Sequence, residues 1–192
     1  MKTEYEATFT NIKKEEMRYI LKKSGATLIK KEFLQKRITF NPPSNLNLKK
    51  AWLRIRDEQD KITLSFKQVL GNKIEDQKEI CLKINNFEEA ELLLTTLGCK
   101  KKAYQENKRE IWKLEDCEIT IDEWPFLEPF LEIEGPSEKS VKIISKKLGF
   151  NYEKAIFGSI DLLYSKKYNI SKDIVCNQTP KIVFNMKNPF MT

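Results

Sequence analysis

Apolar and polar residues alternate with a period of two in eight short segments of the chain. This alternation is typical of strands that place one face on a core and the other on water or on a ligand. The segments are residues 4–9, 33–40, 51–56, 61–69, 78–84, 105–114, 118–124 and 130–134. The sequence therefore predicts a framework made mostly of strands.

Four other segments carry apolar residues at helical spacing, namely 13–23, 87–97, 137–148 and 152–168. Glycine follows each of the first three, as expected where a helix ends. Asn86 and Glu89 have the spacing of a capping box, whereas Gly158 interrupts the fourth segment. Because strands and helices rarely alternate along the chain, the pattern favours an α+β fold over a doubly wound sheet.

The succession of a helix, a glycine and a lysine-rich strand occurs twice, over residues 17–40 and 90–112, which suggests two related halves. A chain of 192 residues is long enough for one good core. We therefore expect one domain over residues 1–170. The remainder, 171–192, is predicted to be a C-terminal tail that is either packed on the domain or flexible.

The composition is that of a water-soluble protein, with 33% charged and 40% hydrophobic residues. No apolar run approaches the ~20 residues that a membrane span needs, and the start of the chain lacks the apolar core of a signal peptide. The four cysteines form no CxxC pair. These features predict a cytoplasmic protein with reduced thiols and no membrane partner, either a monomer or a homodimer.

Histidine is absent from the chain. Its absence excludes Ser-His-Asp and Cys-His catalysis and leaves no usual zinc site. Any metal would be held by carboxylate oxygen, which suits Mg²⁺, Mn²⁺ or Ca²⁺. The formal net charge of +7 favours an anionic partner, without saying which one.

Charge is sorted among the predicted strands. The first and the last two strands carry acidic residues on their polar faces, namely Glu4, Glu6, Asp122, Glu132 and Glu134. The middle strands carry basic residues and hydroxyls there, namely Arg54, Arg56, Thr63, Ser65, Lys67 and Arg109. A solvated face normally mixes lysine with glutamate, so this sorting argues against an ordinary sheet with one wet face.

A closed barrel would turn these faces inward, as an acidic wall opposite a basic wall. Buried charge without a partner costs several kcal/mol per ion, so such an interior requires a ligand. A divalent cation bound to a polyphosphate would neutralise both walls at once. The chemistry that follows is phosphoryl or nucleotidyl transfer, which depends on positioning and charge neutralisation and needs no histidine.

Five motifs in order resemble those of the CYTH family, also called triphosphate tunnel metalloenzymes. They are ExE at 4–6, LRIR with TLSFK over 53–67, KREIW at 108–112, ITID at 119–122 and FLEIEG at 130–135. The family includes class IV adenylate cyclases, thiamine triphosphatases and inorganic tripolyphosphatases. The resemblance, which runs over about residues 4–164, implies an eight-stranded antiparallel closed β-barrel with helices packed outside. It also implies a triphosphate and Mg²⁺ or Mn²⁺ inside this tunnel.

Carried over by position, the resemblance implies metal ligands at Glu4, Glu6, Glu79, Asp122, Glu132 and Glu134. It implies phosphate-binding residues at Arg54, Arg56, Lys67, Lys108 and Arg109. Among these, Lys67 and Arg109 are the expected catalytic residues, because they would stabilise charge that develops on the oxygens of the triphosphate.

The chain departs from the family pattern at several positions. Thr8 and Asn107 stand where the family usually has lysine, and residues 37–40 read RITF where it often has DxYF. In members similar to thiamine triphosphatase, a tyrosine and a lysine help to activate the attacking water. Both positions are threonine here, Thr39 and Thr8.

A cyclase needs no water nucleophile, because the ribose 3′-hydroxyl attacks. The predicted function is therefore conversion of ATP to cyclic AMP and pyrophosphate, as in class IV adenylate cyclases. One alternative is a triphosphatase that acts on tripolyphosphate, thiamine triphosphate or a nucleotide. Another is a protein that binds nucleotide or polyphosphate without catalysis. We expect no nucleic-acid partner, because the acidic strands would repel a phosphate backbone.

Overall fold

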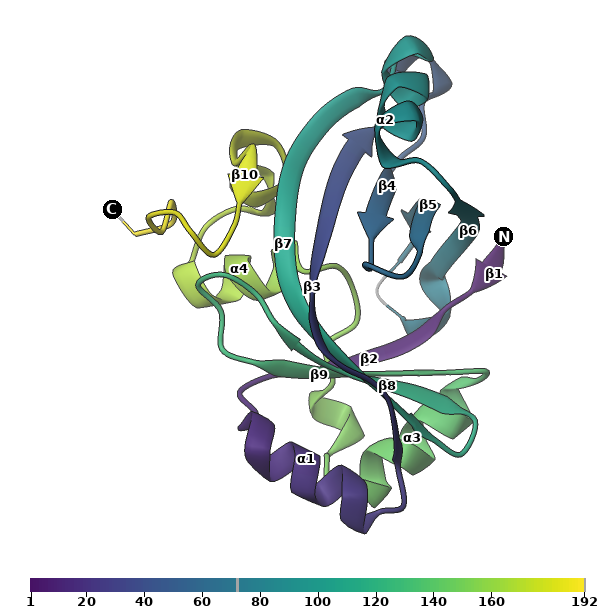
Figure 1. Cartoon of the computed structure of the whole chain (residues 1–192), viewed down its shortest axis with the longest axis vertical. Helices are drawn as coiled ribbons and strands as arrows, with labels where there is room; N and C mark the ends of the chain where they lie inside the picture. The colour runs from purple at the N-terminus through teal and green to yellow at the C-terminus, as the bar shows by residue number, and fades with distance from the viewer. Residues whose placement is uncertain (72, 192) are drawn as a thin grey trace.

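The computed structural model describes residues 1–71 and 73–191, and it has an α+β fold (Figure 1). Its strands are β1 (Lys2–Thr3), β2 (Tyr5–Phe9), β3 (Thr27–Asn41), β4 (Ala51–Asp57), β5 (Ile62–Val69), β6 (Gln77–Ile84), β7 (Lys100–Leu114), β8 (Cys117–Glu123), β9 (Phe130–Gly135) and β10 (Lys181–Ile182). Its α-helices are α1 (Lys14–Lys23), α2 (Phe87–Thr96), α3 (Glu138–Lys147) and α4 (Asp161–Tyr168). None of these helices is long and apolar enough to cross a membrane.

The first nine residues close the barrel. The strand order is β1-β6-β5-β4-β3-β7-β8-β9-β2, and neighbours on this path are antiparallel wherever they pair. β1 pairs with β6 and β2 pairs with β9, so one N-terminal segment joins both edges of the sheet. Counted as one strand interrupted at Glu4, this segment gives the predicted eight-stranded barrel, to which the short β10 is added.

Two long strands form the side of the barrel that is seen in Figure 1. β3 and β7 each contain 15 residues, and they pair with each other along most of their length. Each follows a ten-residue helix that ends before a glycine with positive φ, Gly25 at +84° and Gly98 at +85°. The repeat seen in the sequence is therefore a repeat of structure.

The packing of β8 and β9 on α1 and α3 orients the acidic side chains. Ile119 and Ile121 on β8 and Ile133 on β9 are fully buried in a core with Leu21 of α1 and Val141 of α3. Figure 1 shows these helices below the barrel, on its outer side. Because side chains alternate along a strand, the acidic residues that flank these isoleucines, Glu118, Glu132 and Glu134, face the interior of the barrel.

The predicted helix over 152–168 is wrong in its first half. The structure has a single 3₁₀ turn at Tyr152–Lys154, and α4 begins only at Asp161. Between them, Ile156 forms an antiparallel bridge with Thr8, in which both N–H groups donate to the opposite carbonyl at 3.0 Å. Gly158 has φ of +134°, a conformation that a helix cannot accommodate.

The described part of the C-terminal tail, residues 171–191, packs on the barrel. It contains a π-helical turn at Ile174–Gln178 and then β10, which pairs in parallel with β7 beyond the end of its pairing with β8. Ile182 is fully buried, in a cluster with Trp124 of the β8–β9 connection and Tyr164 of α4. Figure 1 shows this segment beside the middle of β7.

We predict that Ile182→Ala destabilises the whole domain, because it opens a cavity where the tail meets the barrel. The expected loss is roughly 2–4 kcal/mol in the free energy of unfolding, with a fall in Tm of roughly 2–4 °C per kcal/mol. Thermal unfolding followed by circular dichroism measures this change. The neighbouring exposed residue provides the control, Lys181→Ala, which should leave Tm almost unchanged. Equal Tm values for the two variants would show that the tail adds nothing to the domain.

Candidate active site inside the tunnel

A cavity of about 830 Å³ occupies the interior of the barrel. Its lining includes nearly all of the predicted site residues, namely Glu4, Glu6, Arg54, Arg56, Lys67, Glu79, Arg109, Glu132 and Glu134. Residues that lie far apart in the sequence thus share one cavity.

An acidic wall, formed by Glu4, Glu6, Glu118, Glu132 and Glu134, lies along one side of this cavity. In the register of β2, β9 and β8, Glu134 stands directly opposite both Glu6 and Glu118. Like charges that face each other across strands destabilise a sheet. Glu118 and Glu134 are exposed to solvent, which screens part of this repulsion, and a bound cation or a proton would relieve the rest.

The surroundings raise the pKa values of this wall. Burial, with the charge of Glu6 added to it, raises the pKa of Glu132 to about 8. Burial raises the pKa of Glu6 to about 7, helped by the charges of Glu134 and Glu4, and burial also raises the pKa of Glu134. Burial and a hydrogen bond with Glu79 raise the pKa of Glu4 to about 7.

Two basic side chains, those of Lys67 and Arg109, partly neutralise the acidic residues of the cavity. Lys67 Nζ lies 2.8 Å from Glu4 Oε2 and 3.7 Å from Glu79 Oε1. Burial opposes ionisation of Glu79, but its hydrogen bond with Glu4 and the charge of Lys67 lower its pKa to about 2. Beside Lys67, Glu79 is therefore ionised, whereas the neighbouring Glu4 keeps its proton up to a higher pH.

Arg109 belongs to the acidic side of the cavity. Its Nη2 lies 2.8 Å from Asp122 Oδ2 and 2.6 Å from Glu132 Oε2. Asp122 also accepts hydrogen bonds from the Asn107 amide and the Thr120 hydroxyl, each at 2.7 Å. Asp122 is fully buried behind Arg109 and orients that guanidinium.

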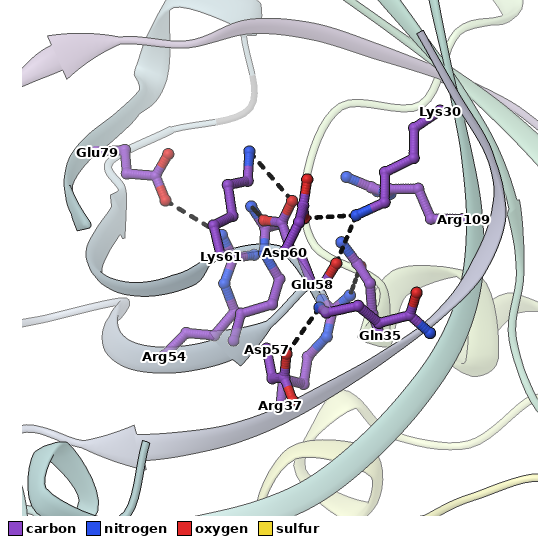
Figure 2. Close-up of polar contacts among 12 residues, drawn as sticks. Lys30, Gln35, Arg37, Arg54, Asp57, Glu58, Asp60, Lys61, Glu79 and Arg109 are labelled. Atoms are coloured by element: carbon purple, nitrogen blue, oxygen red, sulfur yellow. Dashed lines mark hydrogen bonds and ion pairs between the residues drawn. The ribbon is translucent and has the colours of Figure 1, made fainter. Parts of the chain in front are cut away.

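A basic wall, formed by Arg37, Arg54 and Arg56 on β3 and β4, lies elsewhere in the same cavity. Arg54 Nη2 lies 3.2 Å from Glu79 Oε1, and Arg56 Nη2 lies 2.6 Å from Glu58 Oε1 (Figure 2 labels Arg37, Arg54, Glu58 and Glu79).

Hydroxyl groups of β5 stand beside these arginines. In the register of β4 and β5, Ser65 faces Arg54 and Thr63 faces Arg56. Within residues 1–71 and 73–191, both hydroxyls and the Nε atoms of both arginines are buried without a hydrogen-bond partner. Buried polar groups normally have partners, so this row of donors fits an anionic ligand.

The turn after β4 packs against the Arg56 end of the basic wall. Glu58 is almost fully buried there, and Lys61 approaches its carboxylate to 3.2 Å. Lys30 of β3 fixes the turn through the Glu58 carbonyl and Asp60 Oδ1, both at 2.5 Å (Figure 2). Burial by itself would raise the pKa of Glu58, but the charges of Arg56 and Lys61 outweigh this effect and lower the pKa of Glu58.

Lys108 does not join the predicted site. Its Nζ lies 3.5 Å from Glu123 and 4.9 Å from the ring centre of Phe184, away from the residues that line the cavity. The reason is that consecutive residues of a strand point to opposite faces, and Arg109 points inward. The cation near position 107 is instead Arg37, which donates a hydrogen bond to Asn107 Oδ1.

The sequence prediction also missed several cavity residues, namely Arg37, Trp52, Gln77, Gln105 and Glu118. Strand alternation alone points to some of them. Trp52 has the same parity as Arg54 on β4, and Glu118 has the same parity as Asp122 on β8. Glu58 had no such signal, because it lies in the turn between β4 and β5, outside the alternation of either strand.

The carboxylates of the acidic wall are suitable ligands for a divalent cation, although their oxygen atoms do not converge on a single point. Across the described residues, no three Asp, Glu, Cys or His side chains are placed to hold a metal ion together. The acidic wall nevertheless supplies only carboxylate oxygens, which suit Mg²⁺ and Mn²⁺. Burial raises the pKa values of Glu6 and Glu132 and so disfavours their charged forms, and a bound cation would offset this cost.

The model of the CYTH domain matches residues 2–159 of this chain. The chain belongs to the CYTH family. A candidate adenylate cyclase of Methanocaldococcus jannaschii, MJ0240, is 34% identical over 161 residues, which cover 83% of this chain and 85% of that protein.

Solved structures share the fold of this CYTH protein. A candidate adenylate cyclase from Vibrio parahaemolyticus superposes with a TM-score of 0.73 at 12% identity, covering 85% of this chain and 98% of that one. A hypothetical protein from Pyrococcus furiosus gives 0.70 at 24% identity, covering 83% and 99%. HpAC1 from Hippeastrum, described as having a dominant triphosphatase activity, gives 0.56 at 14% identity, covering 88% and 97%.

The raised pKa values predict a pH-dependent stability without metal. Between the ordinary glutamate pKa of 4.5 and about 8, the folded protein binds protons that the unfolded chain has lost. Its free energy of unfolding should therefore fall as pH rises through this window, by at least about 1 kcal/mol. Urea unfolding in a chelator at several pH values measures the fall.

Added Mn²⁺ should restore stability mainly at the upper end of this window. The matched variant is Glu132→Gln, which removes one of these titrations and should flatten the pH dependence. An identical pH dependence in wild type and Glu132→Gln, insensitive to Mn²⁺, would refute the interpretation of the acidic wall.

Proposed function

We propose that this CYTH protein is a divalent-metal-dependent enzyme that converts ATP to cyclic AMP and pyrophosphate inside the tunnel. The observation that carries the proposal is that the acidic wall and the basic wall line one cavity. A triphosphate with its cation is complementary to both walls, since the phosphates meet guanidinium groups and the cation meets carboxylates.

The basic wall supports the placement of the phosphates. Arg54 and Arg56 each retain an Nε–H without a partner in the described part of the chain, and so does the hydroxyl of Thr63, which faces Arg56 from β5. A phosphate oxygen would satisfy these donors. Such preorganised donors stabilise the negative charge that develops on a departing pyrophosphate.

The acidic wall supports the placement of the metal. Glu4, Glu6, Glu132 and Glu134 would hold Mg²⁺ or Mn²⁺, with Glu79 and Asp122 orienting Lys67 and Arg109 beside them. When bound, the metal would act as a Lewis acid that neutralises negative charge on the phosphate oxygens. Lys67 lies between the two walls, so neutralisation of Glu4 would free its ammonium group to donate to a phosphate.

The residues at positions 8 and 39 favour a cyclase. Thr39 donates its hydroxyl to the Ala103 carbonyl at 3.4 Å, and Thr8 is buried. Neither side chain is a base that could activate water for hydrolysis. A cyclisation does not need this water, because the nucleophile is a hydroxyl of the substrate itself.

A triphosphatase is the second candidate function. The fold likeness to HpAC1 favours it, because the activity described for that protein is dominantly that of a triphosphatase. This reaction would use the same two walls and differ only in the nucleophile. It would release orthophosphate in place of a cyclic nucleotide.

A turnover screen separates the candidates. The purified protein is incubated with Mg²⁺ or Mn²⁺ and with ATP, GTP, thiamine triphosphate or tripolyphosphate, and each product is followed separately. Cyclic AMP and pyrophosphate in equal amounts are expected from ATP. Orthophosphate alone would assign a triphosphatase. Tight triphosphate binding without turnover would refute an enzyme and leave a binding protein.

We predict that Glu134→Gln lowers metal-dependent kcat/KM by at least about 100-fold, because it removes one negative charge from the centre of the acidic row. The fold should remain intact, since glutamine has the same shape. Steady-state kinetics with Mn²⁺ measures the loss. Glu16→Gln on the exposed side of α1 serves as the matched control and should keep wild-type activity. Near-wild-type activity of Glu134→Gln would remove this residue from the metal site.

A further inference from the structure

Arg37 lies in the second half of β3 with its side chain inside the barrel. It lines the cavity and is only 6% exposed. Its Nη2 donates to Gln35 Oε1 at 2.9 Å and to Asn107 Oδ1. Its guanidinium carbon lies 4.5 Å from the ring centre of Trp124, so the group is held on an aromatic face.

Positive charge is concentrated around Arg37. In the register of β3 and β4, Arg37 stands directly opposite Arg56, and Thr39 stands opposite Arg54. Burial lowers the pKa of Arg37 well below its usual value, and the charges of Arg54, Arg56 and Arg109 add to this effect. An arginine nevertheless stays charged in proteins, so the repulsion must be balanced by negative charge.

The other arginines of the cavity each have a carboxylate partner, whereas Arg37 has none among the described residues. Arg54 pairs with Glu79, Arg56 with Glu58, and Arg109 with Asp122. Within residues 1–71 and 73–191, no acidic side chain forms an ion pair with Arg37, and its Nε is buried without a hydrogen-bond partner. A buried charge of this kind is strongly unfavourable unless a ligand completes it.

We propose that Arg37 binds a phosphate group of the substrate, in an anion subsite shared with Arg56. The inference rests on the proposed function and adds to it a phosphate-binding residue on β3 that the sequence motifs do not contain. Asn107 positions the Arg37 side chain, because it accepts a hydrogen bond from Arg37 and donates one to Asp122. The same amide therefore connects the basic wall to Arg109.

A purely structural role is the competing explanation. Arg37 could serve only to pack against Trp124 and to hydrogen-bond Gln35. That role predicts that loss of Arg37 lowers Tm while the affinity for phosphates stays the same. Our proposal predicts that the affinity changes.

The direct test is the Kd for inorganic tripolyphosphate, measured by calorimetry in a chelator. Wild type is compared with Arg37→Gln and with Arg18→Gln, a control in which the lost arginine pairs with Glu110 outside the cavity. A charge-assisted hydrogen bond contributes about 1.5–3 kcal/mol, so Arg37→Gln should raise Kd roughly 10- to 150-fold. Arg18→Gln should bind as wild type does.

Wild-type Kd for a folded Arg37→Gln would overturn the role of Arg37 and leave the proposed function standing. Failure of the wild type itself to bind tripolyphosphate, with or without Mn²⁺, would overturn both. An equal loss of affinity in Arg18→Gln would show a general effect of arginine removal and would also overturn the proposal.

A second measurement titrates the wild-type chain and does not depend on Arg37→Gln, in case that variant does not fold. The Nε–Hε signal of Arg37, assigned by its absence from the spectrum of Arg37→Lys or by direct side-chain assignment, is followed by NMR during a titration with tripolyphosphate. A shift that saturates with the calorimetric Kd is expected. A signal that stays fixed while tripolyphosphate binds would exclude Arg37 as a ligand.

Discussion

Like charges that face each other across neighbouring strands are the constraint on which this structure depends. Glu134 lies between Glu6 and Glu118 in one row, and Arg37 lies opposite Arg56 in another. The barrel places both rows around one cavity, in which Arg37 is buried while Glu118 and Glu134 remain exposed to solvent. Each row is unfavourable alone, and a ligand that carries both signs of charge relieves both. This complementarity supports the proposal that the cavity takes a cation and a polyanion together.

Barrel closure produces this arrangement from simple local rules. The N-terminal segment pairs with both β6 and β9, so Glu4 and Glu6 reach the same cavity as the arginines of β4. The isoleucines of β8 and β9 pack on α1 and α3, which turns the acidic residues on the opposite faces of these strands inward. The tail completes the structure beside β7, beyond the region that matches the CYTH domain, and residues 172, 173 and 175–177 also line the cavity.

Strand alternation predicted much of the site because it depends only on neighbours in the sequence. It placed Glu6, Arg54 and Glu132 on inward faces, and the structure agrees. It missed contacts that depend on register between distant strands, such as Arg37 opposite Arg56. It could not foresee the burial of Glu58, which comes from tertiary packing, or the extension of β3 back to Thr27 through mostly exposed residues that do not alternate. The helix over 152–168 failed because the backbone of Ile156 pairs with Thr8.

The central claim is that one cavity holds the metal on the acidic wall and the phosphates on the basic wall. A crystal structure with Mn²⁺ and tripolyphosphate, with manganese located by its anomalous scattering, tests this claim most directly. The account predicts an anomalous peak among the carboxylates of β2 and β9, with phosphate oxygens on Arg37, Arg54 and Arg56. Manganese outside the barrel, or tripolyphosphate bound at the outer surface, would contradict it.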